Sequence, residues 1–162
     1  MPKTIVIDGL SQKNINNAIK EVQKYKQWVL QKETELRVRL ASVGATVASI
    51  QFSRAIYNGT NDISVRVDDT GSVAVIYAEG ESVAFIEFGS GDRYGHGHPQ
   101  AGEHGMGPGT YPSDKGLWNN PKGWWYGHGQ HSYGNPPAMA MYQAVQAMTE
   151  QITMIAKEVF RT

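Results

Sequence analysis

The segment from residue 83 to residue 137 constrains the fold most, because it combines glycine and proline with histidine and aromatic residues. It holds 13 of the 18 glycines, six of the 7 prolines, three of the 4 tryptophans and all 5 histidines. Glycine and proline interrupt helices and strands, so a long connection without regular structure is predicted here. Regular elements are expected before and after it, and the specific chemistry of the protein is expected inside it.

A long amphipathic helix is predicted before this segment. Ser11 is placed to cap its start, and Gly44 marks a possible kink that would divide it into two pieces. Lys26 and Glu33 interrupt its apolar stripe, which argues against a continuous two-stranded coiled coil. The helix either packs on its own sheet or also contacts a neighbour in an oligomer. The stripe, spaced by three and four residues, consists of Ile15, Ile19, Val22, Val29, Leu36, Leu40, Val43, Val47 and Ile50.

Short strands and a final helix complete an α+β prediction. Residues 4–9 are typical of a strand ending in a turn, and residues 63–67 and 72–77 of an antiparallel pair. Residues 83–88 fit either a short helix or a third strand. A closing helix is predicted from Pro136, since proline is tolerated in a first helical turn. Its apolar positions are Met139, Tyr142, Val145, Met148, Ile152, Ile155, Ala156 and Val159. Residues 1–162 are expected to form one domain with a long loop at about 89–135.

Composition excludes several classes of protein. Lys+Arg and Asp+Glu balance at 15 each, so no global field favours nucleic acid or an anionic membrane. There is no cysteine for a disulfide or a thiolate metal site. No apolar run approaches the roughly 18 residues of a membrane span, so a protein made in the cytoplasm with no membrane partner is expected. Charged residues are only 19% of the chain, which indicates surface hidden against copies or partners.

The histidines and carboxylates of the segment do not match a known catalytic or metal motif. His96, His98 and His104, or His128 with His131, could offer imidazoles to zinc or nickel, but no helical HExxH pattern is present. Ser90 lies between glycines without the GxSxG context of a nucleophile elbow. We therefore expect no catalytic residue, no native metal and no cofactor.

The aromatic residues of the segment predict contacts rather than chemistry. Large rings can pin a long loop to the body, and they also anchor protein interfaces. Stacking on sugars or single-stranded bases is the alternative. The rings concerned are Trp118, Trp124, Trp125, Tyr126 and Tyr133. Glu87, between Ile86 and Phe88, is expected on an exposed face, with burial against a partner at a subunit contact as the second possibility.

Several motifs resemble one family in their order. Residues 85–91 read Phe-Ile-Glu-Phe-Gly-Ser-Gly, followed by His98-Pro99, by Gly-Trp-Trp-Tyr at 123–126 and by Gly-Asn-Pro-Pro-Ala-Met-Ala-Met-Tyr at 134–142. This order is similar to that of the neck or tail-completion proteins (minor tail components) of long-tailed, non-contractile phages and prophages. Ala140 stands where that family commonly has proline, and residues 155–160 also resemble the family's ending.

The resemblance implies a structural virion protein of the phage head–tail junction that is not an enzyme. Such proteins assemble in the host cytoplasm as rings, commonly hexamers or dodecamers, that touch connector and tail proteins and meet DNA only incidentally as neighbours of its channel. The expected assembly interface consists of Phe85, Glu87, Phe88, Trp118, Trp124, Trp125, Tyr126 and Tyr133. An aromatic-loop module that binds a glycan or cell-wall fragment is the alternative.

Overall fold

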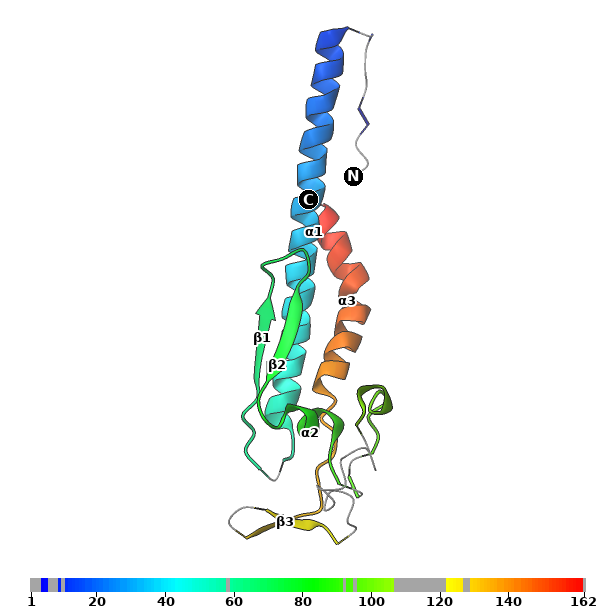
Figure 1. Ribbon diagram of the computed structural model, residues 1–162. Helices are drawn as coiled ribbons and strands as arrows, with labels where there is room; N and C mark the ends of the chain where they lie inside the picture. The colour runs from blue at the N-terminus through cyan, green and yellow to red at the C-terminus, as the bar shows by residue number, and fades with distance from the viewer. Residues whose placement is uncertain are drawn as a thin grey trace.

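The computed structural model confirms the α+β class (Figure 1). It describes residues 4–5, 9, 11–57, 59–91, 93–94, 96–106, 122–126 and 129–161. The elements in chain order are α1 (Gln12–Arg54), β1 (Ser64–Asp68), β2 (Val75–Glu79), α2 (Val83–Phe88), the 3-10 helix η1 (Gly102–His104), β3 (Trp124–Tyr126), β4 (Gln130–Ser132) and α3 (Ala140–Arg161). Of the strand predicted at 4–9, Thr4 and Ile5 have no regular structure, and residues 6–8 lie outside the described residues.

Helix α1 begins as predicted but does not break at Gly44. Ser11 Oγ accepts a hydrogen bond from Asn14 N at 3.2 Å, which satisfies an amide of the first turn. The helix then continues unbroken to Arg54, so the predicted division at Gly44 is wrong. A Cβ at Gly44 would lie 2.5 Å from Ile76 Cδ1 and 2.7 Å from Met148 Sδ. Glycine therefore serves here to admit side chains of β2 and α3.

The buried face of α1 is lined by small residues. Ala41, Gly44 and Ala48 are buried together with Phe52, and α1 packs mainly against α3. Most of the predicted stripe between Val29 and Val47 lies beside this face and is half-buried. Small side chains allow two helices to approach closely. The contact surface is therefore rotated from the stripe that hydrophobicity alone predicts.

The first part of α1 extends beyond the end of α3, as Figure 1 shows. Near that end, Trp28 contacts Phe160 edge to face, with ring centroids 5.9 Å apart. Before it, Ile15, Ile19 and Val22 are 36%, 49% and 53% exposed. The stripe thus continues past the intramolecular packing, and the predicted contact with a neighbouring subunit stays a prediction.

Strands β1 and β2 form an antiparallel hairpin whose second strand starts later than predicted. The register runs from Ser64 opposite Glu79 to Asp68 opposite Val75. Residues 72–74 belong to the connection, because the Arg37 guanidinium donates to Gly71 O at 3.1 Å and to Ser72 O at 2.8 Å and holds them against α1. The predicted strand at 72–77 is therefore displaced to Val75–Glu79. Hydrogen bonds from Arg66 lower the pKa of Glu79 in this hairpin.

The segment after the hairpin, residues 83–88, is the short helix α2 and not a third strand.

The closing helix α3 begins at Ala140 rather than at Pro136. A residue that precedes proline avoids the helical region, so the pair Pro136-Pro137 keeps the chain extended. Ala138 N then donates to Ile86 O at 2.8 Å, and Met139 N donates to Glu87 O at 3.1 Å. These bonds join the extended segment to α2 before α3 starts.

The core lies where α1, α2 and α3 meet. Its fully buried members are Ala48, Phe52, Ile86, Ala140 and Ala144, and side chains of the hairpin pack around them. Farther along α3, Ile155 and Val159 are also buried. Val145 and Ile152, which were predicted on the buried face, are 54% and 45% exposed, and Ala140 and Ala144 are the buried residues of the first two turns of α3. None of the described helices is long and apolar enough to cross a membrane.

Candidate functional site

The long loop is closed at its base by a pair of hydrogen-bonded residues. Ser90 N donates to Asn135 O at 2.9 Å, and Asn135 N donates to Ser90 O at 3.0 Å. Ser90 Oγ also accepts from Asn135 N and from Asn135 Nδ2, at 3.2 Å each. Both residues are buried. We call this pair the Ser90–Asn135 clamp.

Glu87 lies beside the clamp, and its position corrects the expectation of an exposed face. The residue is only 5% exposed. Its carboxylate accepts from Met141 N at 3.0 and 3.1 Å and from Tyr142 N at 3.1 Å, in the first turn of α3. A carboxylate at this position satisfies amides that have no intrahelical partner and complements the positive end of the helix dipole. Glu87 is therefore buried with partners from its own chain.

His98 completes the cluster around Glu87. Its Nε2 lies 3.3 Å from Glu87 Oε1, and its Nδ1 accepts a hydrogen bond from Gln100 N at 3.1 Å. The ring packs edge to face against Phe88 and Tyr142, with centroids 4.5 and 5.7 Å away. Sequence reasoning considered His98 as a possible metal ligand, which it did not expect, and as part of the His98-Pro99 motif, and it missed this contact. The sequence carries no spacing that would have linked it to Glu87.

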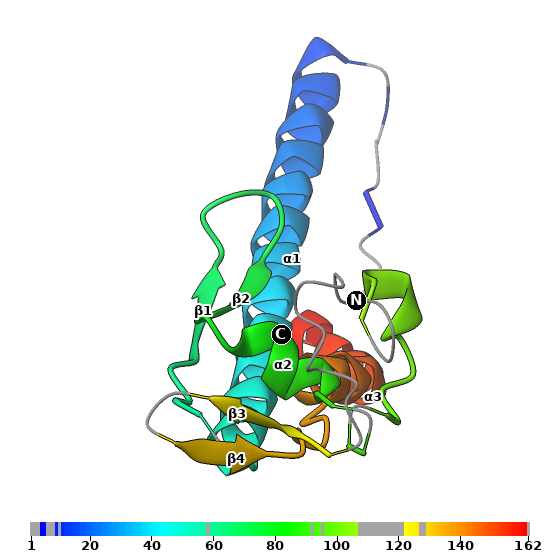
Figure 2. The same cartoon turned by 60° about the horizontal axis from the view of Figure 1, so that its bottom comes forward.

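The predicted irregular loop contains a second hairpin, β3–β4, which the prediction missed. Trp124 pairs with Ser132, and Tyr126 pairs with Gln130. Figures 1 and 2 place this hairpin at the same end of the molecule as α2. Gly123 and Gly129 adopt left-handed φ angles of +73° and +76° at its ends, which a non-glycine residue rarely adopts. Three-residue strands between glycines leave too short an alternation to be detected in sequence.

One face of this hairpin carries an exposed row of aromatic rings. The Trp125 and His131 rings meet edge to face at 4.7 Å, and His131 meets Tyr133 at the same distance. The Arg93 guanidinium lies 5.7 Å from the Tyr133 ring and 5.2 Å from the Tyr94 ring. Trp125 is 69% exposed and Tyr133 44%. Trp125 therefore does not pin the loop to the body; its ring is presented to solvent.

The predicted interface residues divide between two places. Phe85, Glu87 and Phe88 lie on α2, and Phe88 is half-buried between His98 and His104. Trp124, Trp125 and Tyr126 form β3, and Tyr133 follows β4. Trp118 lies outside the described residues.

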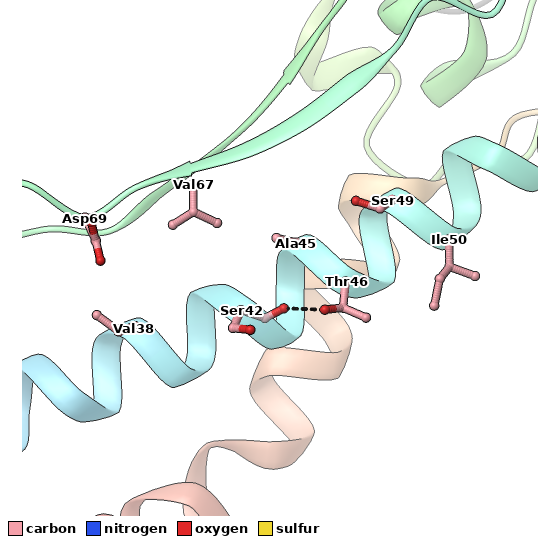
Figure 3. A pocket seen from close by; sticks show the side chains of 8 residues that line it. All are labelled: Val38, Ser42, Ala45, Thr46, Ser49, Ile50, Val67 and Asp69. Atoms are coloured by element: carbon pink, nitrogen blue, oxygen red, sulfur yellow. Dashed lines mark hydrogen bonds between the residues drawn. The ribbon is translucent and has the colours of Figure 1, made fainter.

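A shallow groove lies between α1 and β1. Its volume is about 550 Å³. Figure 3 shows Val67 pointing from the strand toward α1, and Thr46 Oγ1 donating to Ser42 O at 2.8 Å. The lining offers small hydroxyls and a single carboxylate, and a groove this open does not enclose a small molecule. The residues that line the groove are Val38, Ser42, Ala45, Thr46, Ser49, Ile50, Val67 and Asp69.

The described side chains do not gather into a metal centre. Among them, no group of three or more His, Cys, Asp or Glu residues lies close enough to hold an ion. His98 is engaged by Glu87 and Gln100, and His131 lies between two aromatic rings. His128, one of the candidate ligands, is outside the described residues.

Comparison with known proteins gives no relative: no protein-family model, no curated protein and no solved structure matches this chain.

Proposed function

We propose that this protein is a structural component of a phage head–tail junction that completes the neck or tail by assembling into a ring. The proposal rests on the resemblance of its motifs to neck and tail-completion proteins. In that role the protein is not an enzyme. It is built into the virion, assembles in the host cytoplasm, and touches copies of itself and adjacent connector and tail proteins.

The meeting of the two clearest motifs is the observation that best supports the proposal. The stretch at 85–91 contains Glu87 and Ser90, and the stretch at 134–142 contains Asn135 and the amides of Met141 and Tyr142. These residues bond to one another, although 44 residues separate Ser90 from Asn135. The motifs thus form the base of one structure, in which β3 presents Trp125 to solvent. An exposed tryptophan on a hairpin whose loop is closed by the Ser90–Asn135 clamp is suited to contact with a neighbouring subunit.

Measurement of the assembly state tests the proposal. Size-exclusion chromatography with light scattering over a wide concentration range, followed by negative-stain microscopy, is expected to reveal rings of six or twelve copies. Because neck proteins can stay monomeric before docking, the same experiment is repeated with the portal and tail-tube proteins of a long-tailed, non-contractile phage. A chain that stays monomeric alone and with those proteins contradicts the proposal.

Trp125→Ala is expected to weaken assembly without unfolding the chain. The ring is mostly exposed, so its loss should change the free energy of unfolding by no more than about 0.5 kcal/mol. Removal of an interface tryptophan should weaken association about tenfold or more. Light scattering and urea denaturation measure the two effects. Val73→Ala is the matched control, since Val73 is 64% exposed on the other hairpin. Equal assembly by both variants would exclude Trp125 from the interface.

A glycan-binding module is the second candidate, and the same exposed ring favours it, because tryptophan faces stack on sugars. Titration with chitooligosaccharides and peptidoglycan fragments, followed by tryptophan fluorescence, separates the two functions. Saturable binding by a strict monomer that is lost in Trp125→Ala would replace the assembly role.

A further inference from the structure

The groove between α1 and β1 is a largely apolar surface with one charge. Val38, Ile50 and Val67 line it, and all three are exposed. Small side chains of α1 lie between Val38 and Ile50, which allows a second helix to approach closely. Among the described residues that line the groove, Asp69 is the only charged one, and Figure 3 shows it at the Val38 end. The groove therefore suits an elongated apolar segment that carries one positive charge.

The first part of α1 has the matching features. Ile15, Ile19 and Val22 form an exposed apolar stripe, and Lys26 takes the next position of the same stripe. From Ile15 to Lys26 the helix advances by 11 positions, and along the groove, from residue 38 to residue 50, it advances by 12. At about 1.5 Å per residue, the two spans are about 17 Å and about 18 Å long. The stripe and the groove therefore agree in length and apolar character, and their charges are opposite.

The stripe cannot reach the groove of its own chain. Helix α1 runs unbroken from Gln12 to Arg54 and carries both surfaces, so it cannot fold back on itself. Figure 1 shows the first part of α1 extending beyond the hairpin that borders the groove. The occupant of the groove must therefore come from another molecule, and a second copy of this chain supplies a segment of the right length and charge.

We propose that the stripe of one copy packs in the α1–β1 groove of a second copy, with Lys26 of the first beside Asp69 of the second. Because Asp69 lies at the Val38 end of the groove, this pairing makes the two α1 helices antiparallel. The inference rests on the self-assembly in the proposed function, and it names the surfaces that meet.

The placement of the two surfaces makes this contact head-to-tail. At about 3.6 residues per turn, the stripe and the groove lie on roughly opposite sides of α1. Two straight copies therefore cannot exchange both contacts with each other. Each copy gives its stripe to one neighbour and its groove to another, and a contact of this kind closes as a ring or continues as a filament.

Charge reversal tests the contact, with analytical ultracentrifugation of the purified chain as the measurement. The native chain should associate beyond two copies as its concentration rises. Lys26→Glu and Asp69→Lys should each weaken association about tenfold or more, because each brings two like charges together. The two changes combined in one chain should restore association to within about threefold of the native affinity. Both side chains are exposed, so the midpoint of urea denaturation should not move in any of these variants.

Lys20→Glu is the matched control, because Lys20 is an exposed lysine of the same helix outside the stripe. This variant carries the same change of charge as Lys26→Glu and should associate like the native chain. If Lys26→Glu associates as tightly as Lys20→Glu, or if the combined change restores nothing, the contact is refuted, while assembly through another surface leaves the proposed function intact. Association that stops at two copies, or a chain that alone stays monomeric at millimolar concentration, also refutes the contact. The proposed function fails separately, when the chain stays monomeric with the portal and tail-tube proteins as well.

Discussion

Glu87→Ala is expected to destabilise the protein by about 3 kcal/mol, which is among the largest effects of any single substitution in this chain. The change leaves Met141 N, Tyr142 N and His98 Nε2 without their acceptor at a site that is 5% exposed. Buried donors without partners cost about 1–3 kcal/mol each, and loss of a helix cap costs about 1 kcal/mol. The first turn of α3 can relax in part, so the total loss of stability is smaller than the sum of these costs. Urea denaturation followed by circular dichroism measures the effect.

Two further variants assign the loss to the carboxylate. Glu87→Gln keeps one oxygen acceptor but removes the charge that the α3 dipole favours, so it should lie between the native chain and Glu87→Ala. Glu150→Gln removes an exposed carboxylate from α3 itself and should change stability by less than about 0.5 kcal/mol. If Glu87→Ala were as stable as Glu150→Gln, the cap would not form in solution.

The helices and the first hairpin could be predicted because each has sequence signals that lie within the element itself. The cap at Ser11, the spacing of three and four in α1 and α3, and the alternation at residues 63–67 are signals within one element. They gave the α+β class and the order of α1, the first hairpin and α3. The start of α3 was misplaced because the prediction weighed the tolerance of a first turn for proline. It did not weigh the constraint that Pro137 places on Pro136.

The candidate site depends on contacts between elements, which a single sequence does not display. A glutamate between two apolar residues, as at Glu87, fits a strand with one solvent-exposed face. Because α2 is a helix, the Glu87 side chain instead lies toward α3. Gly44 has the same local context whether it breaks a helix or admits Ile76 and Met148. In each case the outcome depends on a residue far away in the chain.

The clamp at the base of the long loop should be highly sensitive to one methyl group at Gly134. This residue has φ +97°, and a Cβ built on it would lie 1.9 Å from Ser90 O and 2.6 Å from Ser90 C. The obstacle is backbone, so the chain must move and lose the paired bonds between Ser90 and Asn135. Strain at positive φ adds to the loss of two buried hydrogen bonds. We expect Gly134→Ala to lower the free energy of opening the clamp by about 3 kcal/mol.

Amide exchange at Ser90 and Asn135 measures this effect, which corresponds to roughly a hundredfold faster exchange from the opened state. Gly105→Ala is the matched control: Gly105 also has a positive φ, +64°, but a Cβ there meets nothing within 4 Å. That variant carries backbone strain without a clash and should cost about 1 kcal/mol, confined to the residues around η1. If Gly134→Ala and Gly105→Ala lowered the local stability by the same amount, backbone strain alone would explain both losses. If Ser90 and Asn135 exchanged at native rates in Gly134→Ala, the clamp would not close the loop. A hundredfold effect at Gly134 alone would show that the Ser90–Asn135 bonds depend on the close backbone approach at Gly134.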